Sequence, residues 1–66
     1  MTRSSAIVAM VRGEKVRHRF FDSNEWVKMN PDDNYEFEDG VICTPELFWM
    51  DRSGELWYDD LVIVNE

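Results

Sequence analysis

The chain has no covalent or metal cross-link with which to stabilise a fold, because its 66 residues include one cysteine, Cys43, and one histidine, His18. A single cysteine forms no intramolecular disulfide, and this pair supplies only half of the ligands of a structural zinc site. A domain of this size hides only about 60% of the surface that its unfolded chain exposes. The fold must therefore depend on close packing of its nine aromatic residues.

The composition favours one small folded domain over residues 1–66. Apolar residues make up 44% of the chain and charged residues 32%, which is too hydrophobic for an intrinsically disordered protein. The longest apolar run near the start, residues 6–11, is too short for a membrane span or a secretion signal. One free cysteine is typical of a reducing compartment, so we expect a cytoplasmic protein without a membrane partner.

The net charge of −7 is divided unevenly along the sequence. Residues 1–28 contain six Lys or Arg and three Asp or Glu, whereas residues 29–66 contain Arg52 alone against eleven acids. Phosphate binding needs a basic surface, so we expect no direct contact with nucleic acid through the acidic half. A basic partner, such as a nucleic-acid-binding protein, is the better inference.

Residues 6–21 read AIVAMVR-GE-KVRHRFF, which is two runs typical of β-strands on either side of Gly13 and Glu14. A glycine at the first position of a two-residue loop is typical of a type II′ turn. We therefore predict a first hairpin in which Val11 lies opposite Val16.

His18 lies in the middle of the apolar face of this predicted hairpin. It is either a general base or pH switch, or a hydrogen-bonded, partly buried structural histidine. The structural interpretation is favoured, because the sequence places no carboxylate, serine or cysteine beside it. On the other face, we interpret Arg17 and Arg19 as a solvated pair, with phosphate contact as the alternative.

The middle of the chain indicates further strands and a hairpin. A turn over residues 22–24 precedes a strand that starts at Glu25 and ends at Pro31. The next strand, YEFE, runs into the dipeptide Asp39-Gly40, which strongly favours a hairpin.

A two-residue loop at this turn would fix the register of the hairpin. Phe37 would lie opposite Ile42, and Glu36 opposite Cys43. Lys28 on the preceding strand would face Glu36, and both glutamates of YEFE would be solvated. The stretch NPDDNYEFEDG lacks the spacing of a calcium-binding loop, so we predict no metal and no cofactor.

A short helix is predicted near residues 45–52, with Thr44 as its N-cap, Pro45 in its first turn and Arg52 in its last. The four consecutive apolar residues of LFWM go right round such a helix.

Two tryptophans are candidate anchors for a partner. If Leu47, Phe48 and Met50 face inward, Trp49 lies nearest the solvent; the alternative is that it packs on a neighbouring strand or loop. Trp57 is the second candidate.

The final strand, LVIV, is apolar on both faces, which is typical of a central strand or of one covered twice. We expect it to lie against the first hairpin. The sequence as a whole predicts a mainly β domain, with α+β as the alternative class. The predicted sheet is an antiparallel meander of about five strands, accompanied by one short helix. A small barrel is the alternative form of this sheet.

Carboxylates on alternate residues of a strand are about 7 Å apart, comparable with two phosphate steps along a DNA duplex. If the last strand brings the acidic segments to one side, they form a DNA-like stripe; the alternative is a scattered acidic surface that gives solubility. The predicted partner-binding residues are Asp32, Asp33, Glu36, Glu38, Trp49, Trp57, Asp59 and Asp60.

The sequence favours binding over catalysis. A nucleophile needs a base within hydrogen-bond reach, and Cys43 and His18 belong to separate predicted hairpins. No phosphate loop, serine elbow or zinc motif is present. We therefore expect no enzyme activity.

The segments VRHRFF, NEWVKM and FEDGVICTPELFW, within residues 11–50, resemble small uncharacterised acidic proteins of tailed bacteriophages. The resemblance implies an origin rather than a chemistry. Such proteins commonly bind a host or defence protein in the cytoplasm of the infected cell, and some present carboxylates in place of DNA phosphates. It assigns no site residue.

The functional hypothesis is therefore a non-catalytic protein-binding module, an inhibitor or modulator of a basic host or defence protein. The alternative is a self-assembling or structural accessory protein, in which the basic N-terminal hairpin of one copy meets the acidic half of another. A homodimer is one form that such an assembly would take.

Overall fold

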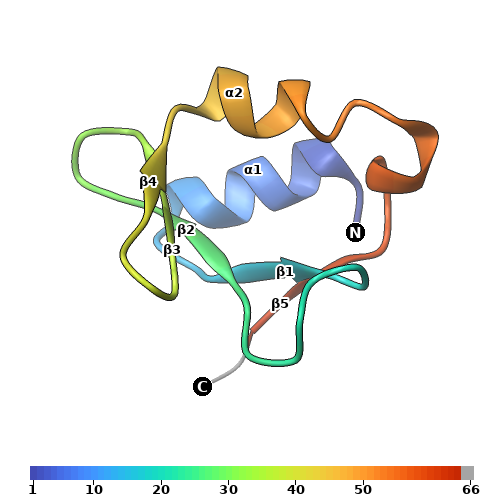
Figure 1. Ribbon diagram of the computed structural model, residues 1–66, viewed down its shortest axis with the longest axis horizontal. Coiled ribbons are helices and arrows are strands. Elements are labelled where there is room, and N and C mark those ends of the chain that lie inside the picture. Colours follow the sequence, from blue (N-terminus) through green and yellow to red (C-terminus); the bar gives the residue numbers. More distant parts are fainter. Residues whose placement is uncertain (65–66) are drawn as a thin grey trace.

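The computed structural model describes residues 1–64, in which five antiparallel strands form one sheet in the order β4-β3-β2-β1-β5 (Figure 1). This confirms the predicted five-stranded antiparallel sheet and the short helix near residues 45–52. The sheet is open, with β4 and β5 as its edges, so it does not form a barrel. The elements are α1 (Arg3–Val11), β1 (Val16–His18), β2 (Val27–Met29), β3 (Tyr35–Phe37), β4 (Ile42–Cys43), α2 (Pro45–Met50), the 3-10 helix η1 (Glu55–Trp57) and β5 (Leu61–Ile63).

The predicted first hairpin is wrong, because α1 occupies its first half. The buried side chains of α1 are Ala6, Ala9 and Met10, at the spacing of three and four that puts them on one helix face. At the end of α1 the amide of Gly13 donates to Met10 O and that of Glu14 to Ala9 O, which is a Schellman motif. Gly13 has a φ of +90°, so the glycine that suits a hairpin turn ends a helix here.

Strands β1 to β4 form the predicted meander, and Lys28 lies opposite Glu36 as expected. The turn between β3 and β4 differs from the prediction. Glu36 pairs with Ile42, because the loop has three residues and ends at Gly40, whose φ is +88°. The shift of one residue moves Ile42 to the outer face of the sheet and Cys43 to the inner face.

Helix α2 begins where the sequence predicts, since the hydroxyl of Thr44 accepts a hydrogen bond from the amide of Leu47. The helix does not take the orientation that would leave Trp49 nearest the solvent. Leu47 and Met50 are exposed, Phe48 is buried and Trp49 is half-buried. Trp49 thus packs on neighbouring elements, which is the alternative that the sequence left open.

Strand β5 pairs with β1, as predicted, through Val16 opposite Ile63 and His18 opposite Leu61. The prediction that this strand is central or covered on both faces is wrong, because β5 lies at an edge of the sheet.

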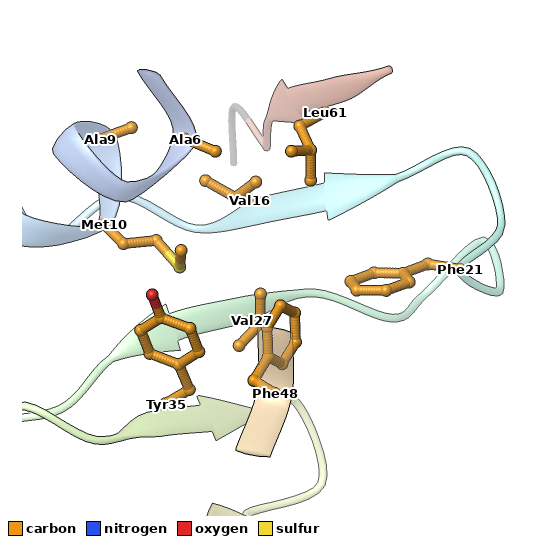
Figure 2. Packing of buried hydrophobic residues seen from close by; sticks show 9 residues of the cluster. All are labelled: Ala6, Ala9, Met10, Val16, Phe21, Val27, Tyr35, Phe48 and Leu61. Atoms are coloured by element: carbon orange, nitrogen blue, oxygen red, sulfur yellow. The ribbon is translucent and has the colours of Figure 1, made fainter. Parts of the chain in front are cut away.

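One face of the sheet is covered by both helices, and the other is open (Figure 1). Figure 2 shows side chains from α1, α2 and the strands pointing toward one another in a single core. No helix within residues 1–64 has the length and apolar character needed to cross a bilayer. The buried core consists of Ala6, Ala9, Met10, Val16, Phe21, Val27, Tyr35, Phe48 and Leu61.

Candidate functional site

The predicted acidic residues fall into two separate groups. In the first group, Asp32 and Asp33 lie in the loop between β2 and β3, Glu36 lies in β3, and Glu38 directly follows that strand. The second group is the pair Asp59-Asp60, which precedes β5. Strands β2 and β1 lie between β3 and β5, a separation of about 14 Å at ~4.8 Å per strand. The antiparallel order also puts the β2–β3 loop and the start of β5 at opposite ends of the strands. The six carboxylates therefore do not form one stripe.

The second acidic group is neutralised within the chain. Asp59 lies 3.7 Å from the amino group of Met1, and Asp60 lies 3.3 Å from Nε of Arg19. These are the two ion pairs found among residues 1–64. Of the predicted acids, only those near β3 remain without a cation partner in this part of the chain.

Trp49 is held by contacts within the protein. Its indole Nε1 donates a hydrogen bond of 2.9 Å to the hydroxyl of Tyr35, and the guanidinium of Arg3 lies 4.8 Å from the centre of its ring. Burial raises the pKa of Tyr35, an effect that the hydrogen bond from Trp49 partly offsets. Trp49 therefore connects α2 to the sheet and offers only part of its ring to a partner.

Trp57, in η1, makes a ring contact with His18 of β1. Their ring centres are 4.3 Å apart. His18 is fully buried; its Nδ1 accepts a hydrogen bond from the amide of Phe20, and Nε2 lies 2.9 Å from the carbonyl oxygen of Leu56. Since a carbonyl oxygen only accepts, Nε2 carries the proton. These bonds tie η1 to β1, which matches the structural interpretation of His18.

An acidic cleft of about 520 Å³ lies at the end of the sheet where β2 begins and β3 ends. Val27 pairs with Phe37, so the antiparallel ladder places the loop before β2 beside the turn after β3. The acidic rim of the cleft consists of Asp22, Glu25, Glu38 and Asp39, and Phe37, Val41 and Arg52 also line it.

Two of these carboxylates also shape the loops that carry them. Glu25 Oε1 accepts a hydrogen bond from the amide of Asp22, and Asp39 Oδ1 accepts one from the amide of Val41. The rim residues are thus positioned by local turns rather than by ion pairs.

Arg52 is the cation that lines the cleft, and aromatic rings hold it. Its guanidinium lies 4.2 Å from the ring centre of Phe48 and 5.4 Å from that of Trp57, and Nη1 donates to the carbonyl oxygen of Phe48. Within residues 1–64 it forms no ion pair with the rim. Four carboxylates against one guanidinium leave the cleft with a net charge of −3.

Sequence reasoning identified only Glu38 of this cleft as a binding residue. Asp22, Glu25 and Arg52 were missed because they are distant from Glu38 in the sequence, and Asp39 was interpreted only as a turn residue. The available signal was the predicted pairing of the second and third strands, which already brings the loop before one strand next to the turn after the other.

The remaining reactive side chain, Cys43, is separated from His18 by strands β3 and β2. Burial raises the pKa of the Cys43 thiol, and nearby Arg52 opposes this only in part, so the thiol is mainly protonated at neutral pH. Across the described 64 residues, no group of three or more His, Cys, Asp or Glu side chains is arranged to hold a metal ion.

Comparison of the chain with protein-family models, with curated proteins and with solved structures gives no match in any of the three.

Proposed function

We propose that the protein is a non-catalytic binding module that takes a basic segment of a partner protein into the acidic cleft. The observation that carries this proposal is the charge of the cleft: four rim carboxylates face one guanidinium that is engaged by aromatic rings. A lysine or arginine side chain has the complementary form, because its charged head meets the carboxylates while its aliphatic stem lies on Phe37 and Val41.

The phage resemblance supports a host or defence protein as the partner, bound in the cytoplasm of an infected cell. The single free cysteine, Cys43, suits a reducing compartment. We favour a local cleft over a DNA-like stripe, since the predicted acids lie in two groups and Asp59 and Asp60 have cation partners.

The test uses a fluorescein-labelled peptide of about twelve residues that alternates lysine and alanine, followed by fluorescence anisotropy. Glu38→Lys reverses a charge at the rim, and Asp32→Lys makes the same change in an exposed loop at the other end of the sheet. Steered binding to the cleft predicts a loss of about tenfold in affinity for Glu38→Lys and less than about threefold for Asp32→Lys. Binding should also weaken between about 25 mM and 150 mM salt.

Equal losses in the two variants would mean that the peptide responds to the net charge rather than to the cleft, and the site would be wrong. A glutamate–alanine peptide of the same length is the control for non-specific adsorption. If the basic peptide binds no better than this control, the proposed function fails.

Self-assembly remains a second candidate in a changed form, because the predicted basic hairpin does not exist. Arg17 and Lys28 lie instead on the open face of β1 and β2, where neither takes part in an ion pair with the described residues, and the Nζ atoms of Lys15 and Lys28 lie 4.5 and 5.7 Å from the ring centre of Trp26. This basic face of one copy complements the acidic cleft of another. Such head-to-tail association would weaken as salt is added.

A further inference from the structure

Strand β5 is unusual for an edge strand. Natural sheets commonly protect their edges with charged residues, proline or a covering segment, since unpaired backbone groups at an edge accept further strands. The residues of β5, Leu61 to Ile63, carry no charge and no proline. Val62 is 50% exposed on the open face of the sheet.

The backbone of this edge is only partly covered. The amino group of Met1 donates to the carbonyl oxygen of Leu61, and the amide of Leu61 donates to the carbonyl oxygen of Met1. Ile63 lies opposite Val16, and because Val64 N donates to Lys15 O at the next position, the N–H and C=O of Ile63 point away from β1. No residue among 1–64 pairs with these two groups.

A groove of about 290 Å³ runs along this edge, between β5 and α1. Its apolar lining includes Met1, Ala9, Ile63 and Val8, which is 51% exposed. An apolar groove beside unpaired strand groups is suited to a further strand that brings its own apolar side chains.

The charges at this edge favour a second copy of the chain as the occupant. Asp59 and Asp60 are each paired with a cation, and the groove itself carries one base, Arg12, and one acid, Glu14. On a molecule with a net charge of −7, the described residues of this edge are locally neutral, which reduces the repulsion between two copies that meet here. A patch with one base and one acid is complementary to itself under a two-fold rotation.

We propose that two copies of the protein pair through antiparallel β5 strands, with Ile63 of each copy exchanging two backbone hydrogen bonds across a two-fold axis. The two sheets then form one sheet of ten strands, with both copies of α1 on the same side. This interface does not use the acidic cleft, so the dimer and the proposed function are tested independently of each other.

The first test is sedimentation equilibrium on two matched variants of α1. Val8→Lys places a charge in the groove, whereas Val11→Lys makes the same change at a residue that is 66% exposed and does not line it. The wild type should dimerise at about 100 µM, Val8→Lys should weaken the dimer at least tenfold, and Val11→Lys should change it less than about threefold. Both positions are exposed, so circular dichroism should show both variants folded.

Charge exchange provides the second test. Arg12→Glu alone gives each groove two acids and should weaken the dimer, whereas Arg12→Glu combined with Glu14→Arg restores one charge of each sign and should recover it. Added salt should strengthen this dimer, because screening reduces the repulsion between two copies of charge −7. Head-to-tail association of the basic face with the acidic cleft has the opposite salt dependence.

Amide hydrogen exchange distinguishes strand pairing from any other contact. The Ile63 amide should exchange more slowly as protein concentration rises through the dimer range, while the Val41 amide, in the β3–β4 turn away from this edge, stays unchanged. A wild type that remains monomeric at about 100 µM in high salt, or Val8→Lys and Val11→Lys variants that behave alike, would overturn the proposal. An Ile63 amide whose exchange is independent of concentration would do so too.

Discussion

The two edge strands of the sheet, β4 and β5, differ in length, charge and coverage. Edge β4 has two residues, is followed directly by α2, and adjoins a turn whose carboxylates Glu38 and Asp39 have no cation partner within residues 1–64. Edge β5 is apolar, and the acids beside it are each paired with a cation. One edge is short and repels other negatively charged chains, whereas the other is electrically neutral and partly uncovered.

The difference shows that the net charge of a small protein says little about any one surface. Charge is concentrated at the β4 side, where we propose that a basic partner binds, and is cancelled at the β5 side, where we propose that a second copy binds. Both proposals rest on where the carboxylates have partners and where they do not.

The largest expected effect comes from truncating a large aliphatic side chain in β5. The same truncation in β4 serves as the comparison. Leu61 is 2% exposed in the core, so Leu61→Ala should lower the free energy of unfolding by about 2–5 kcal/mol. Ile42 is 55% exposed on the outer face, and Ile42→Ala should cost less than about 1 kcal/mol. Urea unfolding followed by tryptophan fluorescence measures both.

Because a domain of this size has little stability to lose, the milder Leu61→Val is measured beside Leu61→Ala. If Leu61→Ala is unfolded in water, the loss for Leu61→Val is compared with that for Ile42→Ala. Similar losses at the two positions would show that β4 and β5 contribute equally to the core, contrary to the burial of Leu61 and the exposure of Ile42.

An intermediate effect is expected at the β4 side, where Tyr35 accepts the indole hydrogen bond of Trp49. Tyr35→Phe should lower the free energy of unfolding by about 1 kcal/mol, since the half-buried indole N–H loses its partner. The pKa of Tyr35 is raised in the folded protein, so its stabilising effect is complete below the unfolded pKa of about 10 and is lost as pH rises through the folded value.

Unfolding curves from pH 7 to alkaline pH therefore should show wild type and Tyr35→Phe converging above about pH 10. A difference between them that stays constant at alkaline pH would contradict burial of the Tyr35 hydroxyl in the folded state.

The smallest effect is expected for the exposed ion pair at the β5 edge. Asp60→Asn should cost at most about 0.5 kcal/mol, because surface pairs are screened by water and salt. Asparagine tolerates the φ of +64° at this position. Asp32→Asn, which removes an exposed carboxylate that has no ion pair with residues 1–64, should leave stability unchanged or slightly higher. Urea midpoints at low and high salt compare the two, and a larger loss for Asp32→Asn would reverse the assignment of neutralised and free acids.

The local signals in the sequence were sufficient for several elements. Thr44 and Pro45 predicted the start of α2, and the turn chemistry after Pro31 and at Gly40 predicted the β2–β3–β4 meander. These features depend on neighbouring residues only. The pairing of β5 with β1 was also predictable, because so apolar a strand has few places to pack.

The errors arose where one local signal fits two structures. Gly13 supplies a positive φ that serves a hairpin turn and a helix C-terminus equally well. The β-branched residues of AIVAMV favoured a strand, but Ala6, Ala9 and Met10 form a buried stripe only in a helix that covers the sheet. Packing against that sheet decided between the two.

The sequence by itself determined that this chain folds without cross-links, that its sheet is antiparallel, and that its negative charge is concentrated after residue 28. Only the tertiary structure decided which carboxylates have partners, which strand lies at an edge, and that the loop before β2 joins the β3–β4 turn in one cleft. The physical reason is range: turns and caps are set by a few adjacent residues, whereas charge pairing and edge exposure depend on which distant segments the fold brings together.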